Sequence, residues 1–117
     1  MKYVRIFTGP DGLSHFEDVE VELKDDGRAT DISQTLGATG VVFRRTRPEY
    51  DLDWHPAGRR QFVINLSGEV EITASDGEVR RFGPGSVMLA DDTTGKGHLS
   101  KHIGEAERFS IFVHLPQ

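Results

Sequence analysis

The sequence predicts an all-β fold in a single domain. Short stretches of alternating apolar and polar residues recur along the chain, and such alternation is typical of strands with one buried face. Gly, Pro and Asp turns separate these stretches, and 13 glycines in 117 residues suit many tight turns. No segment has the apolar periodicity of a helix of three turns. Short strands with a spacing of roughly 8–12 residues indicate a sandwich or a barrel.

The first two expected strands lie at 3–8 and 14–23, on either side of the turn GPDG. The polar stretch that follows, 24–40, is expected to be irregular. Prolines and glycine turns bound the later strands, and the Asp76-Gly77 turn is a strong hairpin signal. These later strands are expected at 41–47, 51–55, 60–66, 69–74, 78–82, 86–90, 98–103 and 108–115.

Composition excludes several classes of function. The formal net charge of −5 argues against nucleic acid as a partner, because the phosphate backbone favours clustered Lys and Arg. No apolar run approaches the roughly 20 residues that a membrane-spanning helix needs. The absence of cysteine excludes disulfides, thiolate metal sites and a cysteine nucleophile. Since no secretory signal is visible either, we expect a cytoplasmic protein.

The stretch DDTTGKGH at 91–98 contains a fragment that resembles a phosphate-binding loop. Such a loop has the pattern G-x-x-x-x-G-K-[ST], whose backbone N–H groups hold the phosphates. Ala90 stands at the first glycine position and Gly97 at the Ser/Thr position, so both ends of the pattern fail. No nucleotide cofactor is expected, and His98 remains the chemically notable residue of this stretch.

Three of the expected strands carry polar, ligand-type residues on one face. Strand geometry places alternate residues on the same side. A β-barrel with a small polar pocket would need such faces, because convergent polar groups hold a ligand. The residues that share a face are Asp53 with His55, Gln61 with Val63 and Asn65, and His98 with Ser100 and His102.

The stretch DLDWHPAGRRQFVINLSGEVEI, followed by RRFGPGSVMLADDTTGKGH, resembles the two motifs of the cupin superfamily. In the first motif, His55 and Gly68 match the second histidine and the closing glycine. Asp53 stands where the family has its first histidine, and Gln61 where it has glutamate.

In the second motif, Gly85 matches the opening glycine, and His98 matches the histidine with a turn that is two residues longer. The resemblance covers residues 40–115. It implies a single-domain jelly-roll barrel (a double-stranded β-helix) over that range, preceded by N-terminal strands and a loop over 1–39.

Cupins of this kind commonly hold one divalent transition metal through three histidines and one glutamate. The resemblance therefore implies a metal site made of Asp53, His55, Gln61 and His98. Two imidazoles and a carboxylate suit Fe²⁺, Mn²⁺, Ni²⁺ or Zn²⁺. In the alternative interpretation, Asp53 accepts a hydrogen bond from a neighbouring strand and the barrel holds no metal.

Four further residues are candidates for ligand binding: Arg45, Arg60, Asn65 and His102. Arg45 shares a strand face with Phe43 and could project into the pocket, where a guanidinium would suit a carboxylate or a phosphate. The alternative is that the arginines are outward charges on strand edges.

Two functions remain open. The first is a metal-dependent enzyme that oxygenates, isomerises or decarboxylates a small organic acid, as the resemblance implies. The second is a binding protein for a small metabolite without metal or catalysis.

The apolar residues Trp54, Phe62, Ile64 and Leu66 also allow two interpretations. They form either the core between sheets or an apolar outer face through which two copies pair. Because cupins frequently dimerise through such a face, a homodimer is expected.

Overall fold

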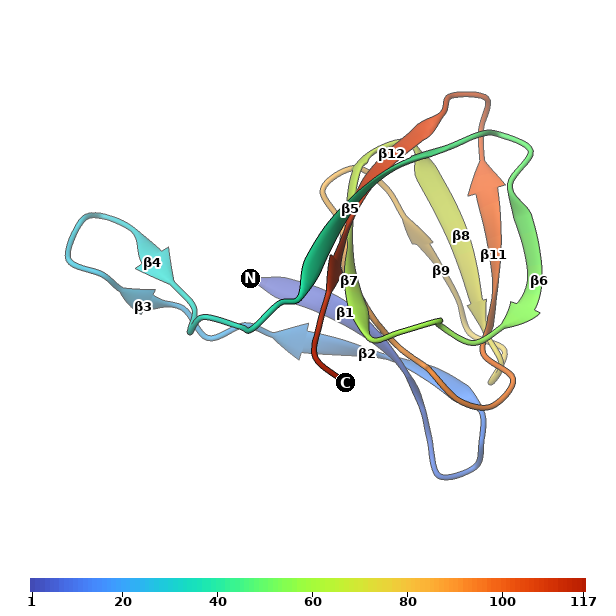
Figure 1. The fold of residues 1–117 in the computed structure, drawn as a ribbon, viewed down its shortest axis with the longest axis horizontal. Helices are drawn as coiled ribbons and strands as arrows, with labels where there is room; N and C mark the ends of the chain where they lie inside the picture. The colour runs from blue at the N-terminus through green and yellow to red at the C-terminus, as the bar shows by residue number, and fades with distance from the viewer.

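The computed structural model describes residues 1–117 and contains twelve strands and no helix (Figure 1). The all-β prediction is confirmed. No helical segment that could cross a membrane is present. The strands are β1 (Lys2–Thr8), β2 (Ser14–Glu20), β3 (Lys24–Asp25), β4 (Asp31–Ile32), β5 (Gly40–Thr46), β6 (Asp51–His55), β7 (Gln61–Ser67), β8 (Glu69–Ala74), β9 (Val79–Phe82), β10 (Val87–Asp91), β11 (His98–Ile103) and β12 (Arg108–His114).

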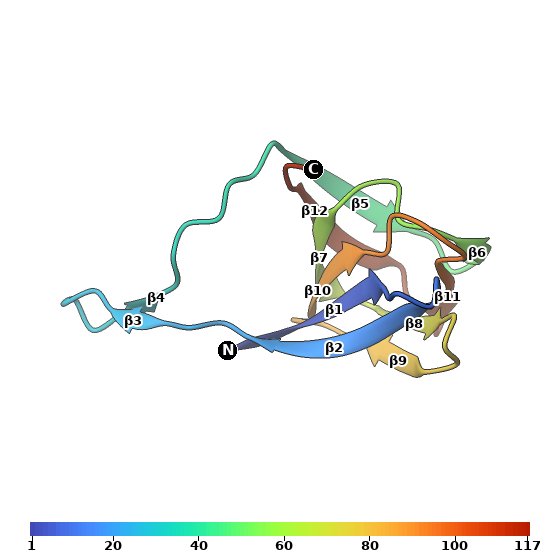
Figure 2. The same cartoon turned by 90° about the horizontal axis from the view of Figure 1, so that it is seen from below.

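Two sheets pack against each other (Figure 2). One has six strands in the order β2-β1-β10-β7-β12-β5, and the other has four in the order β6-β11-β8-β9. No strand of one sheet is hydrogen-bonded to a strand of the other. The architecture is therefore a β-sandwich, and no closed ring of strands is formed.

The last eight strands pair as nested antiparallel partners. β8 pairs with β9, β7 with β10, β6 with β11, and β5 with β12. The two sheets form where the nested pairs join side by side, through β12 with β7 and β11 with β8. Strands that are far apart in the sequence thus lie next to one another, and residues from both ends of the chain meet between the sheets.

The core lies between the two sheets because one face of each strand is apolar. Along β8, Val70, Ile72 and Ala74 are buried, and the intervening residues are half-buried. Phe82 of β9 contacts Phe16 of β2, with ring centroids 6.1 Å apart. Burying a Val, Ile or Phe side chain contributes about 1.5–3 kcal/mol. These contacts hold the four-stranded sheet against the β1–β2 end of the larger sheet.

The larger sheet is apolar on both faces at its centre. In β7, Val63 and Asn65 face the interior, so that Phe62, Ile64 and Leu66 face outward. Leu66 is 53% exposed. Phe62, Ile64 and Leu66 therefore lie on the outer face of the larger sheet and not in the core between the sheets.

A hairpin arm projects from the sandwich (Figures 1 and 2). We define the arm as residues 22–39, all of which are exposed. It contains only the two-residue strands β3 and β4, which pair with each other and with no other strand. The expectation of an irregular segment at 24–40 is therefore largely confirmed, with this short hairpin inside it.

His15, Asp11 and Asp76 form an ion-pair cluster between two turns. The Nε2 of His15 lies 2.9 Å from Asp11 Oδ1, and its Nδ1 lies 3.0 Å from Asp76 Oδ2. The hydrogen bond with Asp11 raises the pKa of His15, and the same contact lowers the pKa of Asp11. The cluster ties the β1–β2 turn to the β8–β9 turn.

We predict that His15→Asn lowers the melting temperature more at about pH 5.5 than at about pH 9. His15 has a pKa raised above its ordinary 6.5, so its stabilisation is complete below that value and is lost as the pH rises through the folded-state pKa. Thermal unfolding followed by circular dichroism at both pH values measures the difference. His114→Asn is the control, because His114 contacts Arg59 and no carboxylate. Equal losses at the two pH values for His15→Asn would contradict the prediction.

Candidate ligand-binding site

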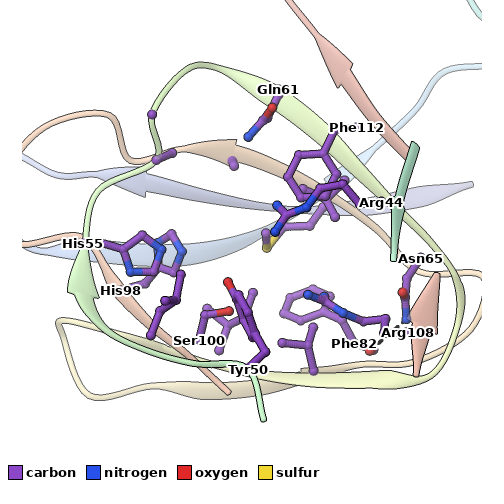
Figure 3. Close-up of a pocket in the computed structure, with 18 of the residues that line it drawn as sticks. Arg44, Tyr50, His55, Gln61, Asn65, Phe82, His98, Ser100, Arg108 and Phe112 are labelled. Carbon is purple, nitrogen blue, oxygen red and sulfur yellow. Dashed lines mark hydrogen bonds between the residues drawn. The ribbon is translucent and has the colours of Figure 1, made fainter. Parts of the chain in front are cut away.

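A cavity of about 270 Å³ lies between the two sheets (Figure 3). Its walls come from β5, β6, β7, β8, β9, β10, β11 and β12 and from the segments that join them. No Asp or Glu lines it, although the whole chain is acidic. The polar lining residues are Arg44, Tyr50, His55, Gln61, Asn65, Ser86, His98, Ser100 and Arg108, and the others are Leu52, Pro56, Ala57, Gly58, Val63, Val70, Ile72, Phe82, Met88, Ala90 and Phe112.

Arg44 and Arg108 enter the cavity without an acidic partner. Neither guanidinium takes part in a salt bridge or in a side-chain hydrogen bond within the protein. They lie against aromatic rings instead: the Cζ of Arg44 is 4.5 Å from the ring centroid of Phe112, and that of Arg108 is 5.6 Å from the centroid of Tyr50. Cation–π contacts of this kind offset only part of the desolvation of a cation.

Arg108 is the more deeply buried of the two, at 4% exposure. Burial lowers the pKa of its guanidinium, and the positive charge of Arg44 lowers it further, while Tyr50 acts in the opposite direction. A buried charge is normally paired, because removing it from water is costly. The two arginines therefore form a site that favours an anion.

Other buried polar atoms around Arg108 also lack partners in the protein. They include the Nε of Arg108 and the Oδ1 of Asn65, both of which belong to residues that line the cavity. The amide nitrogen of Asn65 does donate, to the carbonyl oxygen of Gly68 at 2.7 Å. Since buried polar groups are nearly always hydrogen-bonded, these atoms indicate that a ligand or water completes this end of the cavity.

The imidazoles of His55 and His98 lie together at the other side of the cavity (Figure 3). Their ring centroids are 4.6 Å apart. The Nδ1 of His98 lies 2.5 Å from Oδ2 of Asp92, which is fully buried. The Nδ1 of His55 lies 2.7 Å from the backbone oxygen of Asp53. Because a carbonyl oxygen can only accept, His55 donates from Nδ1, which leaves Nε2 as the acceptor nitrogen in the neutral tautomer.

Gly97 allows the two histidines to come this close. Its φ of +75° suits glycine, and a Cβ at this position would collide with the backbone oxygen of His55. The turn DDTTGKGH thus has a definite role: it carries Asp92, the partner of His98, and the glycine that lets His98 pack against β6.

Asp53, a predicted metal ligand, does not line the cavity. It is exposed, and its Oδ1 accepts a hydrogen bond of 2.8 Å from the backbone nitrogen of Trp54. Between the partners His98–His55 and Ser100–Leu52, β6 advances three residues while β11 advances two. This bulge breaks the period of two, so that Leu52 and His55 face inward and Asp53 faces away. The other three predicted ligands, His55, Gln61 and His98, do line the cavity.

Of the four candidate ligand-binding residues, one lines the cavity and three do not. Asn65 is buried and lines the cavity. Arg45 lies on the outer face with Phe43, where it is 3.5 Å from Glu107, and Arg60 is 3.4 Å from Asp91, so neither faces the cavity. His102 is buried, with no hydrogen-bond partner for either ring nitrogen, but it does not line the cavity.

Sequence reasoning missed Arg44, Arg108 and Asp92. The inward face of β5 carries Arg44, and its outward face carries Phe43, which is the reverse of the usual polarity of a strand. Only the pairing of β5 with β12 in the structure, which the local sequence pattern does not show, places Arg44 inward: its partner Ser110 shares the inward face of the sheet with Asn65.

The four predicted metal ligands fit the structure only in part. No group of three or more His, Cys, Asp or Glu side chains is arranged to hold a metal ion. Two imidazoles and the amide of Gln61 remain in the cavity, without a carboxylate. Protein zinc sites of the catalytic type usually have three protein ligands drawn from Cys, His, Asp and Glu. The cavity offers only two such ligands, the imidazoles of His55 and His98, so its set of usual metal ligands is incomplete.

Comparison with protein-family models gives no match, and no curated protein matches the sequence. Among solved structures, the chain is similar to the crystal structure of the conserved SPY1581 protein of unknown function from Streptococcus pyogenes. The two share 18% sequence identity, the match covers 85% of this chain and 96% of that one, and the TM-score is 0.48. This similarity supports no inference about function.

We predict that Arg108→Met leaves the protein at least as stable as the wild type. The substitution removes a buried, unpaired charge and keeps an unbranched apolar side chain in its place. Thermal unfolding in ligand-free buffer measures the effect, with a rise in melting temperature of a few degrees expected for about 1 kcal/mol. Arg47→Met is the control, since Arg47 is exposed. A loss as large as that of a core truncation would contradict the prediction.

Proposed function

We propose that this protein binds a small organic acid in the cavity between its sheets, with the carboxylate held by Arg44 and Arg108. The observation that carries the proposal is the pair of guanidinium groups without an acidic partner in a cavity that no Asp or Glu lines. A carboxylate would accept charge-assisted hydrogen bonds from both arginines and from unpartnered donors near them.

The size and lining of the cavity limit the rest of the ligand. A volume of about 270 Å³ is at the low end of the roughly 300–1,000 Å³ typical of ligand sites. Val63, Ile72, Phe82 and Met88 give the cavity an apolar middle. These features favour a compact acid of a few carbon atoms over a sugar phosphate or a nucleotide.

The histidine pair favours a hydroxyl group on that acid. In the neutral tautomer with a proton on Nδ1, Nε2 of His55 can accept a hydrogen bond, and Ser100, which also lines the cavity, can accept or donate. A hydroxy acid presents a carboxylate to the arginines and a hydroxyl donor to the histidines. We therefore propose hydroxy acids as the preferred ligand class.

Isothermal titration calorimetry with hydroxy acids of about three to six carbon atoms, the matching unsubstituted acids and the matching amides tests the proposal. The hydroxy acids are expected to bind and the neutral amides are not. Arg44→Gln and Arg108→Gln should each weaken binding at least about tenfold, since a hydrogen bond to a charged group contributes about 1.5–3 kcal/mol.

Arg60→Gln is the matched control, because Arg60 lies outside the cavity against Asp91, and it should leave the affinity unchanged. Binding of the amides as tight as that of the acids, or full affinity in Arg108→Gln, would contradict the proposal.

A second candidate function is binding of a divalent transition metal (Fe²⁺, Mn²⁺, Ni²⁺ or Zn²⁺) at His55 and His98. It is favoured by the hydrogen bonds that orient both rings through Nδ1, which is how metal-binding histidines are usually held. His55 and His98 would hold the ion through Nε2, and Gln61 is the third donor in the cavity. A bound ion would supply Lewis acidity toward an oxygen of the organic acid.

We predict that metal affinity depends on both histidines. Titration of the purified protein with each of the four ions, with and without a bound hydroxy acid, should show binding that His55→Ala and His98→Ala each abolish. His15→Ala is the control, because His15 lies in the ion-pair cluster and does not line the cavity. If no ion binds, or if His98→Ala binds as the wild type does, this second function is excluded and the proposal of acid binding still stands.

The nested strand pairs support a finer description of the fold. Eight strands that pair as β5–β12, β6–β11, β7–β10 and β8–β9 across two sheets follow the pattern of a jelly roll. We propose that residues 40–115 form a jelly roll of the cupin type, with β1 and β2 extending the larger sheet.

A further inference from the structure

The two arginines of the cavity are held apart on neighbouring strands. Arg108 of β12 is the paired partner of Thr46, which follows Arg44 by two residues on β5. The arginines are therefore diagonal neighbours, a relation in which two residues lie roughly 7–8 Å apart. The guanidinium of Arg44 contacts Phe112, whereas that of Arg108 contacts Tyr50 (Figure 3). Each guanidinium is thus held against a different ring.

Each of these guanidiniums is free to bind an anion of its own. A planar guanidinium can lie against a ring and still offer a pair of N–H groups to the two oxygens of one carboxylate. Neither Arg44 nor Arg108 uses its N–H groups in a hydrogen bond within the protein. One carboxylate can bind only one of the two guanidiniums in this bidentate way, so a second place for a carboxylate remains.

The charge of the cavity is also that of two cations. The positive charge of Arg44 lowers the pKa of Arg108, so the two guanidiniums repel each other. No Asp or Glu of the lining compensates either of them. A ligand with one negative charge would leave one cation unpaired, and unpaired charge in a buried site is unfavourable. A ligand with two negative charges would pair both.

The arginines on the surface beside Arg44 differ from it, because they have acidic partners. Arg45 lies 3.5 Å from Glu107, and Arg47 lies 3.9 Å from Glu49. All three arginines line one open hollow on the surface, and Arg44 is the one among them without an acidic partner. The unpaired charge is therefore specific to the side chain that also reaches the cavity.

Arg44 marks the mouth of the cavity and Arg108 its buried end. The open hollow and the cavity share Arg44 and Tyr50, so the two spaces meet at these residues. Arg44 is half-buried, whereas Arg108 is buried and lines only the cavity. A ligand with an anionic group at each of two positions could thus contact one arginine deep in the cavity and the other near its mouth.

We propose that the preferred ligand is a short hydroxy dicarboxylic acid, with one carboxylate on Arg108 and the other on Arg44. The inference rests on the proposed function, because it takes the cavity as a site for an organic acid. A monocarboxylic acid still binds in this arrangement, since its carboxylate can contact each arginine through one oxygen. The second carboxylate adds a bidentate contact and the second negative charge.

Isothermal titration calorimetry with four acids of equal chain length tests the inference. The acids are butyrate, 2-hydroxybutyrate, succinate and malate, compared near neutral pH and at constant ionic strength because salt screens charge. Malate is expected to bind at least about tenfold more tightly than 2-hydroxybutyrate, as for an added hydrogen bond to a charged group. Succinate should exceed butyrate by a similar factor, since the gain does not depend on the hydroxyl.

Variants locate the second carboxylate. Arg44→Gln and Arg108→Gln each leave one guanidinium, so the ratio of malate affinity to 2-hydroxybutyrate affinity should fall to about one in both. Arg45→Gln is the matched control, because it removes the same charge from the next residue of β5, which faces outward against Glu107. It should keep the wild-type ratio.

Two kinds of failure are distinguishable. Equal affinities of the wild type for malate and 2-hydroxybutyrate, or a ratio that is unchanged in Arg44→Gln or equally reduced in Arg45→Gln, would overturn the inference and leave the proposed function intact. Binding of none of the four acids would contradict the proposed function, and the inference with it.

Discussion

The burial of Arg108 without a negative partner is the constraint on which the rest of the interior depends. A guanidinium at 4% exposure, beside a second guanidinium and with its pKa lowered by burial, would be unfavourable in a sealed apolar core. The sandwich therefore keeps a cavity next to it and lines that cavity with amide, hydroxyl and imidazole groups. The unpaired charge of Arg108 lowers the stability of the folded chain, and the anion that we propose as ligand would pair with it.

Over part of the six-stranded sheet, the usual polarity of the two faces is reversed, with polar residues toward the interior and apolar residues toward solvent. On β5, β7 and β12 the polar residues Arg44, Asn65 and Arg108 face inward beside Val63 and Phe112, while Phe43 and Leu66 face solvent. The polar inner face lines the cavity, and the apolar outer face leaves Phe43 and Val41 exposed to solvent.

The alternation of apolar and polar residues was sufficient to predict the strands, because every long strand packs one face against the other sheet. Turn glycines and prolines then gave the boundaries to within a few residues. The pairing of strands far apart in sequence was not readable from local pattern. That pairing was implied only by the resemblance to cupins. The comparisons with known proteins do not show this family, so the cupin-type fold is a proposal.

The sequence predicted part of the site, and each wrongly predicted residue has a specific structural cause. His55, Gln61, Asn65 and His98, which were chosen from strand alternation, do line the cavity. Asp53 was misplaced because the bulge in β6 adds a residue, which periodicity does not show. Arg45 was chosen over Arg44 because Phe43 was assumed to face inward. A strand with its apolar face toward solvent reverses that assumption.

Titration of the protein with a hydroxy acid, followed by NMR of the arginine side-chain Nε–H groups, tests the central claim most directly. Anion binding by the buried pair predicts that the Nε–H signals of Arg44 and Arg108 shift with saturation, while those of exposed arginines such as Arg47 stay unchanged. Signals of Arg44 and Arg108 that do not move while the acid binds elsewhere would contradict it.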